Sequence, residues 1–513
     1  ISNLMLGLNM NYSNSSPFIT RMVNALPFLE TNADSKISVE AEWAKLMPGH
    51  SKAVSKEGAA YIDDFEGAKT PINLKSYVGW YLASTPQGNE LFPEGDLVND
   101  LEYGYNRARL SWYVIDPYMQ RNTAPSYLLQ QEKLDDHRVR EVFQSEIYPE
   151  KQLPVGQPTN IPTLDLAFYP QERGPYNFET TGGATSSGVD RNGQLINPES
   201  RWGGIMRKIE TSDFETANVE YIEFWMMDPF AMDPASNPNP GGDLYFNLGN
   251  ISEDILRDGR KSFEHGLPAD GSTTDVDQTI WGRVSQNQSL VKAFDNSSAA
   301  RKYQDVGLDG LSTADEQSFH QAFLTKLQSV VDGTAFQTIY NDPSNDNFHY
   351  FRGSDYDRDQ LDVLERYKLY SNTDGNSPTN EQSPESYSTA ATSIPDVEDI
   401  NDDNTLNESE NYFQYRLKLT RENMVVGKNY IADIKKDVPV TLKSGKKSQI
   451  TWYQFKIPVA SPDKAYGQIS DFKSIRFIRM FLRGWQRPVV VRFASLDLVR
   501  TNWRRYDKTL NDD

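Results

Sequence analysis

The sequence predicts a mainly β protein, a β-sandwich that carries long helical and acidic loop insertions. Three observations predict this class. Several segments are rich in β-branched and aromatic residues, which favours strands. Two others repeat apolar residues at helical spacing. A third kind of segment, residues 369–415, has ten acidic residues and no Lys or Arg, which is typical of a solvated loop.

The expected elements follow the chain in order. Near its start, apolar side chains alternate with others and predict one strand; they are Leu4, Leu6, Leu8, Met10 and Tyr12. The strongest strand patterns come later, at residues 218–227, 448–459, 473–482 and 488–499. Helices are predicted at residues 316–331 and 359–369.

These elements suggest one dominant domain. We expect residues 1–55 to form an N-terminal strand and linker segment. Residues 56–513 then form a single large domain, with insertions at about 115–215 and 250–415. No window offers about 18 consecutive apolar residues, so the sequence predicts no membrane-spanning helix.

Composition excludes several functions. The 513 residues include 52 Lys and Arg against 72 Asp and Glu, a formal net charge of −20. Nucleic acid is therefore not expected as a partner, since phosphate binding needs a basic surface. The chain has no Cys, which excludes disulfides, thiolate metal sites and cysteine nucleophiles.

The acidic stretch contains the best candidate for a metal site. Residues 399–410 (DINDDNTLNESE) place oxygen donors at positions 1, 3, 5, 7, 9 and 12, the spacing of an EF-hand calcium loop. The candidate ligands are Asp399, Asn401, Asp403, Thr405 and Glu410. Asn404 stands where glycine is usual, and Asn tolerates the left-handed conformation. The alternative is an acidic loop without an ion.

A second calcium candidate is weaker. Residues 305–316 place acids at positions 1, 5 and 12, namely Asp305, Asp309 and Glu316, with Gly310 at position 6. Position 3 is Gly307, which offers no side-chain oxygen. Glu316 also opens a predicted helix, so it has an alternative role in stabilising the helix N-terminus.

A third candidate joins distant parts of the chain. Residues 61–67 (YIDDFEG) resemble the opening strand of galactose-binding-like jelly rolls, and residues 493–499 (FASLDLV) resemble the closing strand. The resemblance implies a jelly-roll-like sandwich in which Asp64, Glu66 and Asp497 share a structural calcium. The alternative is a pair of acids at a strand entry.

No catalytic signature is present, so we expect no enzymatic activity. HExxH, GxxxxGK[ST] and GxSxG are all absent. A glycoside hydrolase is an alternative, because its reaction needs only a pair of carboxylates and the chain has many. Six tryptophans are candidate sugar-stacking platforms for a carbohydrate-binding module, although core packing is their commoner use; they are Trp80, Trp112, Trp202, Trp225, Trp281 and Trp452.

Seven long stretches carry a further resemblance. They are YIDDFEGAKTP (61–71), YNRARLSWYV (105–114), QPTNIPTLDLAFYPQERGPYNF (157–178), RWGGIMRKIETSDFET (201–216), GDLYFNLGNISEDILRDGRKSFEHGLPA (242–269), YQDVGLDGL (303–311) and NFHYFRGSDYDR (347–358). Together they resemble the SprA (Sov) family, the outer-membrane translocon of the type IX secretion system of Bacteroidetes.

The resemblance implies a role in protein secretion and gliding motility. The family protein is much longer and forms a very large β-barrel with soluble insertions, of which this chain would be one. Implied partners are the remainder of the translocon barrel, a PorV-like outer-membrane protein, a plug protein and secreted cargo proteins. The implied location is the outer membrane. Long insertions favour the extracellular face, with the periplasmic face as the alternative.

Overall fold

The structure is a computed structural model. It describes residues 4–26, 35–47 and 69–501, apart from residues 235, 290, 296, 298, 371–375, 378–384 and 386–393. The chain divides into two compact units, Ile1–Ala68 and Lys69–Asp513. The expected boundary between residues 55 and 56 lies outside the described residues. Among the described helices, none is both long and apolar enough to cross a membrane.

The N-terminal unit contains an antiparallel hairpin. Strand β1 (Leu4–Ser15) pairs with β2 (Lys36–Met47), and helix α1 (Pro17–Val23) follows β1. The strand predicted from the alternating residues near the N-terminus is thus present within β1. The register places Leu8 opposite Trp43, and both side chains are exposed within this unit.

The larger unit is built on two antiparallel sheets. The first has seven strands. Six of them follow one another in a linear order, and the short strand β3 (Lys69–Asn73) pairs with β19 outside that order. The linear order is β15 (Ile431–Thr441), β16 (Lys447–Pro458), β10 (Val219–Met227), β19 (Val489–Thr501), β8 (Leu164–Arg173) and β5 (Ala108–Tyr113).

The second sheet has six strands. Their order is β17 (Lys464–Tyr466), β14 (Asn411–Leu419), β11 (Gly242–Asn250), β18 (Phe477–Arg483), β9 (Trp202–Lys208) and β4 (Tyr81–Leu82). The four strongest strand predictions are confirmed as β10, β16, β18 and β19. Each supplies β-branched and aromatic residues to a surface that the fold buries.

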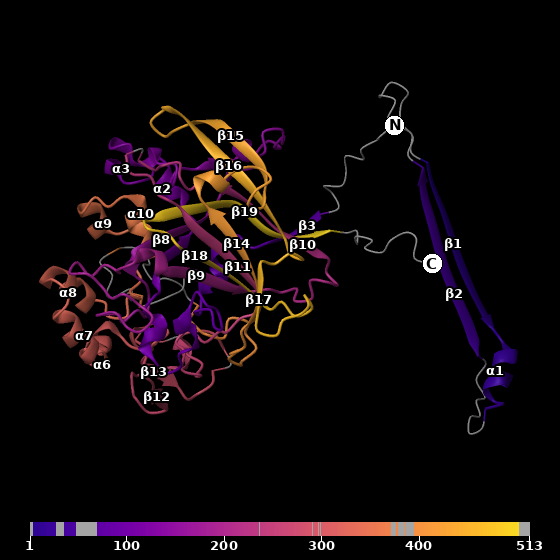
Figure 1. The fold of residues 1–513 in the computed structure, drawn as a ribbon, viewed down its shortest axis with the longest axis horizontal. Helices are drawn as coiled ribbons and strands as arrows, with labels where there is room; N and C mark the ends of the chain where they lie inside the picture. Colours follow the sequence, from indigo (N-terminus) through magenta and orange to yellow (C-terminus); the bar gives the residue numbers. More distant parts are fainter. Residues whose placement is uncertain are drawn as a thin grey trace. The chain divides into compact units, whose positions relative to one another are not determined.

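The two sheets pack face to face and enclose one apolar core. Phe224 of β10 lies 5.6 Å from Phe246 of β11 in the other sheet, and 4.8 Å from Phe455 of its own sheet (ring centroids). Successive strands β8, β9, β10 and β11 alternate between the sheets, a connection found in jelly rolls. Figure 1 shows the helices of the larger unit grouped to one side of its sheets. The prediction of a β-sandwich with helical insertions is confirmed.

The first expected insertion is less separate than predicted. Residues 115–215 include β8 and β9, which are inner strands of the two sheets. Between β5 and β8 the chain forms only small elements. They are α2 (Pro117–Gln120), α3 (Ser126–Gln130), α4 (Gln144–Ile147) and the paired strands β6 (Val142–Phe143) and β7 (Asn160–Ile161).

The longest connection runs from β11 to β14 and contains most of the larger helices. It comprises the hairpin β12 (Val276–Gln278) and β13 (Arg283–Ser285), and helices α5 (Arg301–Gln304), α6 (Thr313–Phe319), α7 (Gln321–Gln328), α8 (Gly333–Tyr340), α9 (Ser354–Arg358) and α10 (Val363–Tyr367). Short 3-10 turns occur throughout the larger unit; they are η2 (Tyr77–Gly79), η3 (Pro93–Asp96), η4 (Leu101–Gly104), η5 (Lys133–Asp135), η6 (Pro198–Ser200), η7 (Glu264–Gly266) and η8 (Arg421–Asn423).

One predicted helix is divided in two. The apolar stripe of residues 316–331 spans α6 and α7, which meet at His320. The His320 ring stacks on Phe178, with 4.1 Å between ring centroids, and is buried. Phe323 and Leu327 of the stripe are buried. The predicted helical period is therefore correct. The break between α6 and α7 lies at His320, where its ring contacts Phe178.

Candidate metal centre

The acidic loop with EF-hand spacing folds into a turn closed by its own side chains. The carboxylate of Asp399 accepts hydrogen bonds from the backbone N–H groups of Asp403 (3.0 Å) and Asn404 (2.8 Å). The Asp403 carboxylate accepts from the N–H (2.9 Å) and hydroxyl (2.6 Å) of Thr405, and Asn401 Oδ1 accepts from the Asp403 N–H. Asn404 has φ +64°, so the expected left-handed conformation is present.

A lysine lies beside this turn. The ammonium of Lys261 is 3.6 Å from Asp399 Oδ2 and donates to the carbonyl oxygen of Asn404 at 3.2 Å. Asp402, on the same turn, pairs with Lys208 (2.8 Å) and Lys292 (3.4 Å). Protein cations thus already offset the negative charge of the loop.

Glu410, the expected closing ligand, makes other contacts. Both of its oxygens accept hydrogen bonds from the Arg479 guanidinium, at 2.9 and 3.0 Å, and one also accepts from the Ser252 N–H. The side chains of Arg479 and Glu410 are 0% and 5% exposed. Burial raises the pKa of Glu410, and the charge of Arg479 opposes that rise. The structure therefore brings residues 399–405 of the predicted loop together, whereas Glu410 forms a buried ion pair with Arg479.

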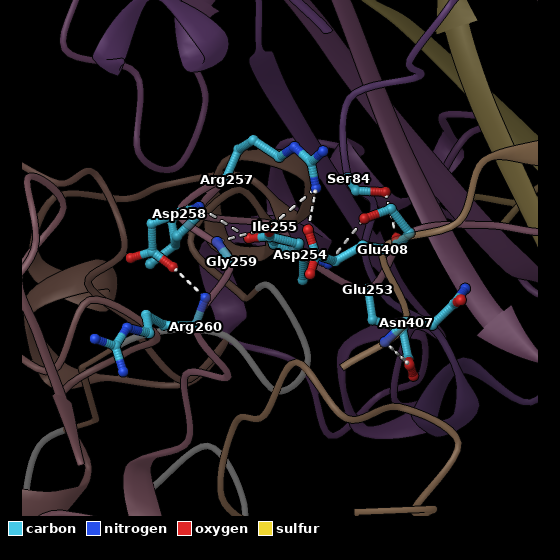
Figure 2. A network of polar contacts seen from close by, with 12 residues as sticks. Ser84, Glu253, Asp254, Ile255, Arg257, Asp258, Gly259, Arg260, Asn407 and Glu408 are labelled. Atoms are coloured by element: carbon cyan, nitrogen blue, oxygen red, sulfur yellow. Dashed lines mark hydrogen bonds and ion pairs between the residues drawn. The ribbon is translucent and has the colours of Figure 1, made fainter. Parts of the chain in front are cut away.

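A polar network holds the segment after β11 against the acidic loop (Figure 2). The carboxylate of Asp254 accepts from the N–H groups of Asp258 (3.2 Å) and Gly259 (3.0 Å). The guanidinium of Arg257 lies between Asp254 (3.2 Å) and Glu408 (3.4 Å), so it bridges the two segments. Burial raises the pKa of Asp258 to about 6.

Buried carboxylates fasten the loops by accepting backbone N–H groups. Glu398 accepts three of them, from Ile255, Leu256 and Ser262, at 2.8 to 2.9 Å. Glu253 and Glu264 each accept three in the same way, across segments distant in sequence. Sequence reasoning missed these three acids. The available signal was an acid flanked by apolar residues, as in ISEDIL at residues 251–256.

A second acidic cluster lies under the insertion helices. One oxygen from each of Glu316, Asp342 and Asp346 lies within 4.8 Å of the other two. Glu316 stands in the first turn of α6, and the two aspartates follow the end of α8. Asn376 donates to both Glu316 Oε1 and Asp346 Oδ1 at 3.0 Å, so its amide lies between two carboxylates.

Asp309 adjoins this cluster through Ser344. The Ser344 hydroxyl donates to Asp309 Oδ2 at 2.6 Å, and its N–H donates to Glu316 Oε2 at 2.9 Å. Thus two of the three acids predicted in residues 305–316 meet in space. The third, Asp305, pairs instead with Arg301 at 2.5 Å and accepts from the Ser377 N–H.

Burial and mutual repulsion dominate the electrostatics of the cluster. Burial raises the pKa of Glu316 to about 7, and the neighbouring Asp342 adds to the rise. Burial likewise raises the pKa of Asp309 and of Asp346 well above the usual range, with Glu316 the largest charge that adds to each. Sequence reasoning missed Asp342 and Asp346. The available signal was the acid- and amide-rich turn at residues 341–347.

The third predicted site is described only in part, because Asp64 and Glu66 lie outside the described residues. Asp497 is on β19, directly opposite Glu223 of β10 and Asn73 of β3. Burial raises the pKa of Asp497 to about 6, and the nearby charge of Lys75 opposes the rise.

The family comparison covers the C-terminal part of the chain. Residues 322–513 match the SprA_N family model, described as motility related/secretion protein. The matched region contains β14 to β19, which are strands of both sheets. No curated protein matches the chain. The match implies a role related to motility or secretion. It supports a relationship between this chain and the SprA family.

Proposed function

We propose that this chain is a non-enzymatic structural segment of an outer-membrane protein-secretion translocon, which covers or guides cargo at the pore. The observation that carries the proposal is the family match across strands of both sheets. The match thus involves the framework of the sandwich and not an appended loop. On this proposal the partners are the rest of the translocon, a PorV-like outer-membrane protein, a plug protein and the cargo.

The structure gives the carbohydrate-binding alternative no added support. All six tryptophans considered as sugar platforms are buried, none more than 5% exposed. Trp112, Trp202 and Trp452, for example, each lie in one of the apolar clusters of the larger unit. A stacking platform needs an exposed ring face, so these residues serve the core.

The test is replacement of residues 69–501 by a short flexible linker within the full-length protein in cells. The expected result is loss of cargo secretion, or entry of large antibiotics that the outer membrane normally excludes. A surface change such as Lys443→Ala, made in the same background, is the control for expression. Unchanged secretion together with unchanged permeability would contradict the proposal.

The membrane face is tested by cysteine labelling, because the chain itself has no Cys. Val155 is fully exposed and Val491 is fully buried, so Val155→Cys and Val491→Cys form a matched pair. We propose the extracellular face, so a membrane-impermeant maleimide should label Val155→Cys on intact cells. Labelling only after the outer membrane is opened would assign the periplasmic face.

A further inference from the structure

We propose that Glu316, Asp342 and Asp346 bind one calcium ion, which joins α6 to the turn after α8. The site is separate from the acidic loop whose spacing resembles an EF-hand. The proposal does not depend on the secretion role. It follows from four features of the cluster, which are its oxygen geometry, one unsatisfied carboxylate oxygen, the lack of an ion-paired cation among the described residues, and its access.

The first feature is the distance between oxygens. Calcium takes oxygen ligands at about 2.4 Å, so ligands on opposite sides of the ion are about 4.8 Å apart. One oxygen from each of the three carboxylates lies within 4.8 Å of the others. An ion placed among them therefore has three protein ligands in reach. Calcium is the ion we propose because it accepts irregular oxygen geometry, whereas magnesium demands a near-ideal octahedron.

The second feature is an unsatisfied atom. Asp346 is only 5% exposed, and its Oδ2 makes no hydrogen bond within 3.5 Å. The Tyr176 hydroxyl, a neutral group, lowers the pKa of Asp346 but supplies no positive charge. Gly307 makes room for this carboxylate, because a Cβ there would lie 2.2 Å from Oδ2. Buried polar atoms in native proteins almost always have a partner. Because the neighbouring carboxylates repel this one, a cation is the partner that suits it.

The third feature is the lack of a paired cation. Within the described residues, neither the three proposed ligands nor Asp309 lies within 4.0 Å of a Lys or Arg nitrogen. The charges of the nearby Arg109 and Arg173 oppose the rise that burial causes in the pKa of Asp342. Neither arginine forms an ion pair with it, because their guanidinium groups donate to backbone carbonyls and to Asn345. Leaving several buried carboxylates without a cation is costly. A divalent ion offsets that charge at one point.

The fourth feature is access. A cavity of about 880 Å³ is lined by Asn347 and Asn376, among others. Asn376 also contacts the cluster through its hydrogen bonds to Glu316 and Asp346. None of the three carboxylates lines this cavity itself, so an ion from solution must pass the Asn376 amide to reach them.

The test is calcium titration of the whole 513-residue chain after chelation and gel filtration. Isothermal titration with calcium chloride should show one site per chain. A saturating amount should raise Tm by about 2–5 °C, because an ion that binds only the folded state stabilises it. Heat of binding and the Tm rise should both be absent in Asp346→Asn. Without calcium, Asp346→Asn should be at least as stable as the wild type, since it removes repulsion.

Two controls distinguish this site from its alternatives. Asp403→Asn changes the acidic loop, and it should keep the full calcium response. Terbium luminescence on the wild type gives a binding signal that does not depend on whether a variant folds. Absence of both calcium heat and terbium signal would overturn the proposal. Loss of the calcium response in Asp403→Asn would also overturn it. A third contrary result would be that lowering the pH stabilises the protein while calcium has no effect, because protons alone would then neutralise the carboxyl groups.

Discussion

Two acidic regions of the larger unit look alike in sequence and differ in their surroundings. In the acidic loop at residues 399–410, the carboxylates meet lysines, an arginine and backbone N–H groups. In the cluster of Glu316, Asp342 and Asp346, the carboxylates also accept from amide N–H groups, but they lie beside one another and form no ion pair with a Lys or Arg among the described residues. The loop has the better calcium spacing, yet the cluster has the greater need for a cation.

The difference shows why donor spacing alone is a poor guide to a metal site. A buried carboxylate gains most from a metal ion when no other cation neutralises its charge. Beside an ammonium group its charge is already neutralised, so the ion adds little. Lys261 and Arg479 supply that compensation to the loop. Both basic residues are distant in sequence from the acids they meet, so no local pattern reveals them.

The largest effect is expected at the buried ion pair of the loop. Arg479→Met should lower the free energy of unfolding by about 3–5 kcal/mol, because it leaves the Glu410 carboxylate buried without its cation. Urea unfolding followed by tryptophan fluorescence measures the change. Adding Glu410→Gln to this variant should recover part of the loss. A loss below about 1 kcal/mol would mean that the loop is not held by this pair, and would weaken the comparison.

An intermediate effect is expected at Glu94, a buried carboxylate outside both regions. Burial raises the pKa of Glu94 to about 7 from an ordinary value of 4.5. The folded state therefore binds this proton more tightly than the unfolded state does. The resulting stability is complete below pH 4.5 and is lost as the pH rises through 7.

Replacing Glu94 by Gln should remove this pH dependence. Glu94→Gln should match the wild type near pH 4 and exceed it at pH 8 by up to about 3 kcal/mol. The measurement is urea unfolding of both proteins across that range. Burial lowers the pKa values of His137, His265 and His320 to about 4, so these residues make the protein more stable as the pH rises. Both proteins contain them, so their effect cancels when the two unfolding free energies are subtracted. A constant difference across pH would show that burial does not shift this group.

The smallest effect is expected in the loop itself. Asp403→Ala removes hydrogen bonds to Thr405 at an exposed turn, and should cost less than about 1 kcal/mol. Thermal melting with calcium and with chelator should show the same calcium-dependent shift as in the wild type. If this change abolished the shift, the loop would be the ion site and the comparison would be reversed.

Much of the fold could be predicted from the chain, and little of the candidate site. The strands β10, β16, β18 and β19 were predictable because their β-branched and aromatic runs suit a buried sheet. Residues 115–215 were harder, since strands β8 and β9 lie there among short loops and turns. Asp309 and Glu316 were identified, whereas Asp342 and Asp346 were missed because nothing local links them to α6.

The sequence by itself determined the class of fold, the absence of cysteine chemistry and the placing of acids in long connections between strands. Those properties depend on residue type and short-range period, which a single chain displays. Only the tertiary structure decided which acids are neutralised. Charge compensation acts through space over a few ångströms, and the pairing of Glu410 with Arg479 or of Glu316 with Asp342 exists only after distant segments pack together.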